Sequence, residues 1–285
     1  MNAHQALDLI VGQARRGELI FPTNMAASLR LQRALGDPGC HLETAAELVL
    51  AEPLIAARLV AIANSVAYTR FGGRVSNVRA AVSLLGFTPL RSLVAAIVVR
   101  QLASEIADAE LRHKAELLWQ HCATVAALAK VLAREFTEID PETALFAGIV
   151  HEIDGFYLLS RAAEFPALFK DDPGASGLKM RAVLVRCILQ TLKIPRPVGG
   201  AVESLFDGSP VRPPVTVDDV LSLANTLAAV ASPLAGWGGI GAETAVGIPD
   251  FSLGIPDFSR DGKTLTAVLE SAADEIRSIT ESLLL

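Results

Sequence analysis

Short signals that begin and end helices recur along the whole chain, and they constrain the fold more than any other feature of the sequence. Thr44-Ala-Ala-Glu47 has the spacing of a capping box, in which the Thr hydroxyl and the Glu carboxylate satisfy backbone N–H groups at a helix start. We therefore expect a helix to begin near residue 45. Pro53 suits the first turn of the next helix, which we expect to end near residues 64–65. Its apolar residues have the spacing of one buried helical face: Ile55, Leu59, Ile62 and Ala63.

Similar signals divide the middle of the chain. Ser76 is a candidate N-cap, and Gly86 suits the position after the last turn of the helix that follows. Thr88-Pro89 combines a cap with a proline and predicts the start of another helix. Apolar residues between about 108 and 136 recur at helical spacing with few breakers, which indicates one long amphipathic helix.

Helix signals continue through the second half. Asp140-Pro141 predicts a helix that runs through residue 153, and Gly155 allows a turn after it. Further helices are expected at residues 180–192, after the cap formed by Thr216 to Asp219, and at 264–283. Alternating runs rich in Val, Ile and Thr, which would indicate strands, are absent from the sequence. Aromatic residues make up only 5% of the chain, which also suits closely packed helices better than sheets.

These patterns predict an all-α protein, a multi-helical bundle of two packed lobes. We expect residues 1–106 to form the N-terminal lobe. Residues 107–285 would form the second lobe, which includes a loop at 232–262 and the C-terminal helix. The loop contains a tandem repeat, GIPDFSL at 247–253 and GIPDFS at 254–259. A lengthened surface loop explains the repeat, and a docking loop that presents Phe251 and Phe258 is the alternative.

The high apolar content, 51% with a mean hydropathy of +0.41, raises the choice between a membrane and a large core. Residues 220–242 form the longest uncharged stretch, but Pro233 and several glycines would break a membrane-spanning helix there. The N-terminus carries Asp8 and lacks the basic and apolar regions of a secretory signal. We therefore expect no membrane span and a cytoplasmic location.

Charge and motifs exclude several function classes. A net charge of −6 provides no overall electrostatic attraction for nucleic acid, although a local basic patch is compatible with it. Cys40, Cys122 and Cys187 have neither disulfide nor metal-site spacing, and we interpret them as small buried hydrophobic residues. The sequence motifs of dinucleotide-binding proteins, P-loop nucleotide hydrolases and α/β-hydrolases are absent.

One group of residues could meet in a helical core. His121 lies in the expected long helix, His151-Glu152 lies near the end of the next one, and Asn225 lies in the helix after Thr216. Their imidazole, carboxylate and amide groups resemble the metal-binding pattern of the HD superfamily of metal-dependent phosphohydrolases. His121 matches the first His of that pattern, His151-Glu152 its His-Asp pair, and Asn225 its final Asp.

More specifically, residues 15–231 resemble the HDOD family, the HD-related output domain of bacterial signalling proteins. Phe21-Pro22 and the segment EPLIAARLVAIANSVAY at 52–68 are similar to the family motifs, and residues 72–94, 118–133 and 142–159 continue the likeness. The resemblance implies an HD-like helical C-terminal lobe.

The departures from the family pattern argue against catalysis. Glu152 is one methylene longer than Asp, and Asn225 is a neutral, weaker ligand for a hard dication. Arg181 stands where the family often has His, and a cation there would oppose a metal. Leu205-Phe206 stands where many relatives have a His pair. We therefore interpret His121, His151, Glu152 and Asn225 as vestigial metal positions, with hydrogen-bonded core histidines, and we expect no catalytic residue and no cofactor.

The resemblance implies a non-catalytic signalling protein that binds partner proteins of two-component or cyclic dinucleotide pathways. The alternative is a divergent metal-dependent phosphohydrolase or cyclic dinucleotide phosphodiesterase. A third hypothesis is a sensor that binds a nucleotide without hydrolysing it. The candidate ligand or partner surface comprises Asn64, Ser65, Arg70, Arg74 and Arg91, although Asn64-Ser65 also suits a simple helix end.

Overall fold

A computed structural model describes residues 1–21, 25–51, 53–63, 75–104, 106–206, 211–237 and 257–284. As expected, the fold is all-α, with one two-residue antiparallel hairpin that pairs Ser259 with Thr264 and Arg260 with Lys263. The elements in chain order are α1 (Ala3–Arg15), α2 (Ala26–Leu35), α3 (Leu42–Leu50), α4 (Pro53–Ala63), α6 (Val78–Leu85), α7 (Phe87–Ser104), α8 (Ala109–Phe136), α9 (Pro141–Val150), α10 (Ile153–Ser160), α11 (Ala175–Thr191), α12 (Arg196–Ser204), α13 (Val217–Leu227), β1 (Ser259–Arg260), β2 (Lys263–Thr264), α14 (Leu265–Ser271) and α15 (Ala273–Leu284).

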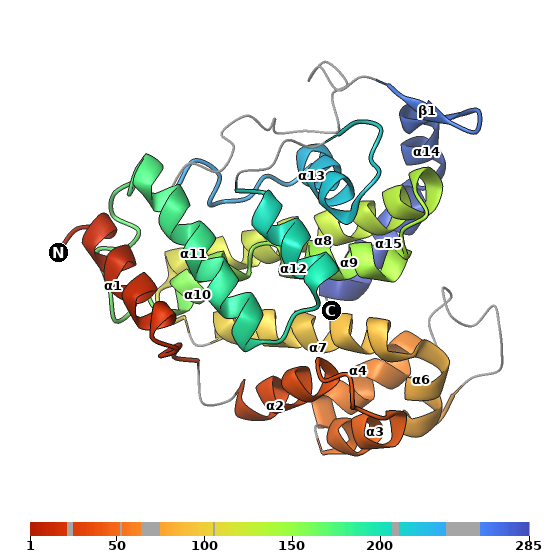
Figure 1. Cartoon of the computed structure of the whole chain (residues 1–285), viewed down its shortest axis with the longest axis horizontal. Helices are drawn as coiled ribbons and strands as arrows, with labels where there is room; N and C mark the ends of the chain where they lie inside the picture. Colours follow the sequence, from red (N-terminus) through yellow and green to blue (C-terminus); the bar gives the residue numbers. More distant parts are fainter. Residues whose placement is uncertain are drawn as a thin grey trace.

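Helix α7 crosses the middle of the molecule, with α2, α3, α4 and α6 on one side and the remaining helices mainly on the other (Figure 1). The second group is built on α8 and α9, against which α12, α13 and α15 pack. Helix α1 packs against α11 and therefore lies with this second group, although its residues precede α2 in the chain. The predicted lobe boundary at residue 106 stays a prediction.

Helices α8 and α9 pack closely together, because small residues line their contact. A Cβ added at Gly148 would lie 2.4 Å from the Ala126 Cα, so only glycine allows this approach. Ala129 and Ala147 are also completely buried in the common core. The short distance between these helices brings the end of α9 beside the middle of α8.

Four predicted helix starts are wrong in detail. Thr88 lies inside α7, which begins at Phe87, and α11 begins at Ala175 and not at residue 180. Helix α3 already begins at Leu42, with His41 at the N-cap, so Thr44 lies inside the helix and caps nothing. Helix α6 is capped by Asn77, whose Oδ1 accepts the Ala80 N–H at 2.8 Å, rather than by Ser76. The caps at Asp140 and Thr216 are confirmed by hydrogen bonds from the first turns of α9 and α13.

The C-terminal region also differs from the prediction. The single helix expected at 264–283 is divided at Ala272 into α14 and α15. Phe258 is half-buried and packs edge-to-face on Phe136, with ring centroids 5.0 Å apart, so this aromatic side chain contributes to the core. Phe251 and most of the tandem repeat lie outside the described residues.

No helix in the described ranges is by itself both long and apolar enough to cross a membrane. Helices α6 and α7 reach that length and hydropathy only as a pair, and the pair is bent by 113°.

Candidate functional site

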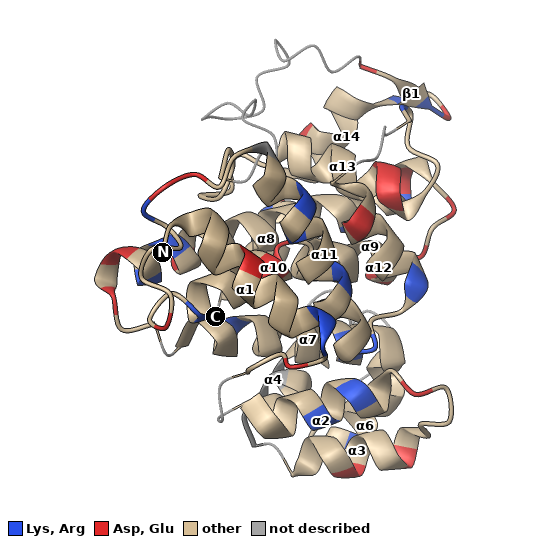
Figure 2. Cartoon of the chain, turned by 60° about the vertical axis from the view of Figure 1, so that its left-hand side comes forward, with Lys and Arg blue, Asp and Glu red and all other residues tan. Residues whose placement is uncertain are grey.

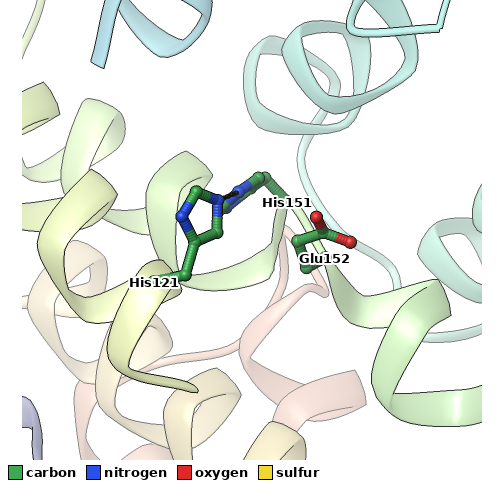
Figure 3. A group of neighbouring side chains, drawn as sticks. All are labelled: His121, His151 and Glu152. Atoms are coloured by element: carbon green, nitrogen blue, oxygen red, sulfur yellow. Dashed lines mark hydrogen bonds between the residues drawn. The ribbon is translucent and has the colours of Figure 1, made fainter. Parts of the chain in front are cut away.

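A break between two helices positions the most polar part of the core. The sequence predicted one helix through residue 153, but α9 ends at Val150 and α10 begins at Ile153. His151 is the C-cap of α9, and Glu152 is the N-cap of α10. Both side chains are buried, and Figure 3 shows them beside His121, which comes from the middle of α8.

His121 and His151 face each other through their Nε2 atoms, which are 3.1 Å apart. The opposite nitrogen of each ring contacts a backbone carbonyl. His121 Nδ1 lies 2.7 Å from the Val230 oxygen, and His151 Nδ1 lies 2.8 Å from the Gly148 oxygen. Since a carbonyl oxygen only accepts, both Nδ1 atoms are donors.

When both rings are neutral, this histidine pair holds one proton fewer than its contacts require. Two carbonyl contacts and one Nε2–Nε2 contact need three protons, whereas two neutral imidazole rings carry two. Burial, and then the neighbouring His121, lower the pKa of His151 to about 4. When both rings are neutral, two Nε2 lone pairs face each other, an arrangement that a further cation would stabilise.

Glu152 points toward a second charged group, Arg181 on α11. The Arg181 Nη2 donates to Glu152 Oε2 at 3.0 Å, and its Nε donates to Asp154 Oδ2 at 2.7 Å. Arg181 is only 1% exposed, and Asp154 is fully buried. One guanidinium group thus bridges two buried carboxylates on α10 and at its N-cap.

The three charges shift one another's pKa values. Burial alone would raise the pKa of Glu152, but nearby positive charge, chiefly that of Arg181, outweighs it, so this pKa falls below its usual value. Burial raises the pKa of Asp154, against the attraction of Arg181. Asp154 Oδ1 has no hydrogen-bond partner among the described residues. Burial would lower the pKa of Arg181, but both carboxylates raise it, so the guanidinium stays charged.

Aromatic groups and a glycine enclose this ion-pair network. Arg181 lies 6.0 Å from the ring centroids of Phe206 and of Trp237, and its Nη1 donates to the Trp237 oxygen at 3.3 Å. A Cβ at Gly155 would lie 2.6 Å from a Leu234 methyl group, so Gly155 serves close packing inside α10 and not the predicted turn. The network is therefore shielded from solvent, which strengthens its electrostatic interactions.

The donor set fits a divalent metal only in part. One ligand atom from each of His121, His151 and Glu152 lies within 4.8 Å of the others, and both rings have the carbonyl partners typical of metal-binding histidines. Glu152, however, already neutralises Arg181. A dication would meet a fixed guanidinium charge beside its one carboxylate ligand, so the residues present do not fit a divalent metal.

Among the described residues, no hydrogen bond joins the other predicted site residues to this cluster. Asn225 is half-buried on α13, and within the described residues no hydrogen bond joins its side chain to His121, His151 or Glu152. Arg91 donates through Nε to the Leu35 oxygen at 2.6 Å and so caps the end of α2. Asn64, Ser65, Arg70 and Arg74 lie outside the described residues, and their role as a ligand surface stays a prediction.

Sequence reasoning missed Asp154 and the segment after α13. The Val230 carbonyl binds His121, and the Ser232 side chain binds Glu152. Asp154 had one available signal: it is a second acidic residue two positions after Glu152 in an otherwise apolar stretch. The backbone carbonyl of Val230 had none, because any residue type supplies it.

Comparisons with known proteins agree with this architecture. The model of the HDOD domain matches residues 21–188. A solved structure from Shewanella amazonensis SB2B, called "Putative metal-dependent phosphohydrolase", is 22% identical with a TM-score of 0.63, and the match covers 99% of each chain. An HDOD domain protein of unknown function from Geobacter sulfurreducens is 19% identical with a TM-score of 0.57, over 97% of this chain and 99% of that one.

A third solved structure, from Marinobacter aquaeolei VT8 and called "Putative signal transduction protein", is 19% identical with a TM-score of 0.57. That match covers 99% of this chain and 65% of the other. No curated protein matches the chain. At these identities the likeness to the solved structures establishes the fold alone.

Proposed function

The chain belongs to the HDOD family, and from this premise we propose that it is a non-catalytic regulatory protein that acts by binding other proteins. One observation carries the proposal. The buried guanidinium of Arg181 supplies a positive charge to Glu152 and Asp154, at the place where an HD-type site would need its carboxylates for a metal.

Charge counting supports this interpretation. Glu152 and Asp154 bring two negative charges, one of them weakened because burial raises the pKa of Asp154, and Arg181 offsets one. The two histidines contribute no negative charge. A hard dication needs several anionic oxygen ligands, and after the pairing with Arg181 this cluster offers at most one. The same cluster can hold the fold together without any metal.

A second candidate function, a divergent metal-dependent phosphohydrolase or cyclic dinucleotide phosphodiesterase, rests on the histidine pair. When both rings are neutral, two Nε2 atoms and a neighbouring carboxylate could supply three ligands to a cation if Glu152 were released from Arg181. For this function the Arg181 side chain would have to leave Glu152, which would expose both carboxylates to an incoming metal.

The metal content of the purified protein separates these functions. We would incubate untagged protein with manganese, iron or zinc, remove the free metal, and measure the bound metal by elemental mass spectrometry. We expect well below one metal per chain and no hydrolysis of bis-p-nitrophenyl phosphate. His151→Ala should change neither result. His113→Ala, at an exposed position of α8, is the matched control.

A full equivalent of metal that His151→Ala removes and His113→Ala does not, together with hydrolysis, would replace the proposal with the phosphohydrolase.

The partners we propose are signalling proteins of two-component or cyclic dinucleotide pathways, since this is what the family resemblance implies. A nucleotide bound without hydrolysis is the third hypothesis, and Arg91 is its one described candidate residue. Because Arg91 is committed to the end of α2, that hypothesis has less structural support.

A further inference from the structure

Exposed basic side chains form a strip that runs from α1 and α11 to α2. We define the basic strip by the following residues: Arg15, Arg30, Arg33, Arg186, Lys193 and Arg196. All six are exposed. In Figure 2, basic segments follow one another from α11 down to α2 on the face that is turned forward. This feature contrasts with the net charge of −6 of the whole chain.

Contacts between the elements join the upper part of the strip. Helix α1 packs on α11, and the Cys187 thiol of α11 lies within electrostatic range of both Arg15 and Arg186. Arg186 also shares a carboxylate with Arg196: Glu203 lies 2.9 Å from the first and 3.8 Å from the second. Helices α1, α11 and α12 therefore present their cations side by side.

The lower part of the strip crosses from α11 to α2. A Cβ built on Gly36, at the end of α2, would lie 2.7 Å from the Lys193 Cβ, so these two segments touch. Arg33 and Arg30 precede Gly36 by three and six residues and therefore lie along the same face of α2. The basic strip therefore continues from the helix group that contains α11 to the helix group that contains α2.

Most of this charge has no internal partner. Within the described part of the chain, no ion pair is formed by Arg15, Arg30, Arg33 or Lys193. Four like charges, three of them on helices and Lys193 in the turn after α11, repel one another, and an external anion would relieve that repulsion. The strip contains five arginines and one lysine, and arginine binds carboxylates with two parallel hydrogen bonds.

We propose that the basic strip is the surface on which this protein binds an acidic segment of a partner protein. This inference rests on the proposed function, since it names the surface and the partner chemistry for the binding role. Four unpaired cations match a short run of carboxylates. Two of the strip's six cations already share Glu203, which leaves fewer for the long run of phosphates that double-stranded nucleic acid presents. Membrane docking usually adds several exposed apolar anchors, and among the described residues of α1, α2, α11 and α12 the large exposed apolar side chains amount to one, Leu9 on α1.

Fluorescence anisotropy of a labelled peptide of alternating Glu and Ser tests the proposal on the full chain. We expect binding that weakens with added salt, and no binding of the same peptide with Gln in place of Glu. Arg33→Glu with Lys193→Glu should weaken binding at least about tenfold, which corresponds to about 1.4 kcal/mol. Lys170→Glu with Arg277→Glu makes the same charge change at exposed positions outside the strip and should change affinity less than about threefold.

Neutralisation by Arg30→Gln with Arg33→Gln is a second strip variant, and circular dichroism verifies that all variants are folded. Equal losses in strip and control variants, or no binding of the acidic peptide, would overturn the proposal. Strip-dependent binding of a DNA oligonucleotide or of phosphatidylserine vesicles, tighter than that of the peptide, would also overturn it and name a different partner. The metal measurement decides the non-catalytic role separately, so either proposal can fail alone.

Discussion

The histidine pair and the carboxylate pair meet at neighbouring residues, His151 and Glu152, but they differ in how positive charge is supplied. The carboxylates receive theirs from Arg181, a residue of the same chain. The imidazoles, when neutral, have one proton fewer than their three contacts require. The comparison teaches that a buried polar cluster can keep the histidine arrangement of a metal site while an arginine side chain, in place of a metal, neutralises the carboxylates.

Removal of the guanidinium should have the largest effect. Arg181→Met leaves Glu152 and Asp154 buried without a counter-charge, and we expect the free energy of unfolding to fall by about 3–5 kcal/mol. Urea denaturation at neutral pH measures the loss. The exposed Arg186→Met on the same helix should cost less than about 1 kcal/mol.

The stability loss of Arg181→Met should depend on pH. Without Arg181 the buried carboxylates have raised pKa values and take up protons on folding, so the deficit relative to the wild type should shrink as the pH falls. A deficit that stays constant between about pH 7 and pH 5 would show that lost packing, and not lost charge, is the cause.

The histidine pair should make the wild-type protein less stable as the pH falls, whereas the stability deficit of Arg181→Met shrinks. The ordinary pKa of His is about 6.5 and that of His151 is about 4, so between these values the unfolded chain binds a proton that the native chain does not. Stability should therefore fall as pH falls through this range, by up to about 3 kcal/mol. His151→Gln should remove most of this dependence, and the exposed His113→Gln should not. Parallel curves for wild type and His151→Gln would contradict the assignment.

A conservative change at Arg181 sharpens the comparison further. Lys keeps the charge but cannot donate to Glu152 and Asp154 with the fixed geometry of a guanidinium. We expect Arg181→Lys to cost about 2 kcal/mol in urea denaturation, less than Arg181→Met. Equal losses for the two variants would mean that the simultaneous hydrogen bonds to Glu152 and Asp154, and not the positive charge, provide the stabilisation.

Asn225 should matter least, because no hydrogen bond ties it to either half. We expect Asn225→Ala to change stability by less than about 1 kcal/mol and to leave the pH dependence unchanged. A larger loss, measured in the same denaturation series, would place Asn225 inside the cluster.

The fold was largely predictable from sequence, since caps and apolar spacing are local signals. Asp140 and Thr216 begin helices as expected. Thr44 shows the limit: its capping box satisfies the residue pattern, but α3 starts three residues before the start that it predicted, where Ala45, Ala46 and Val49 can be buried together. Tertiary packing selected the boundary over the local motif.

The candidate site was predictable only in its residue types. His121, His151 and Glu152 meet as the resemblance implied. Asp154 and the Val230 carbonyl could not be assigned, because their roles depend on the break between α9 and α10 and on the path of the chain after α13. Such long-range placement has no local sequence signal.

Gly148 links backbone packing to side-chain chemistry in a way that shapes how this protein can change over evolution. Its missing side chain allows α9 to approach Ala126, and its carbonyl oxygen fixes the His151 ring. A change at Glu152 or Arg181 disturbs the charge balance of the buried carboxylates but leaves the contact between α8 and α9 in place, whereas a larger residue at Gly148 would disturb the helix pair and the imidazole together. The histidine geometry can therefore outlast any selection for metal binding, preserved as a by-product of helix packing.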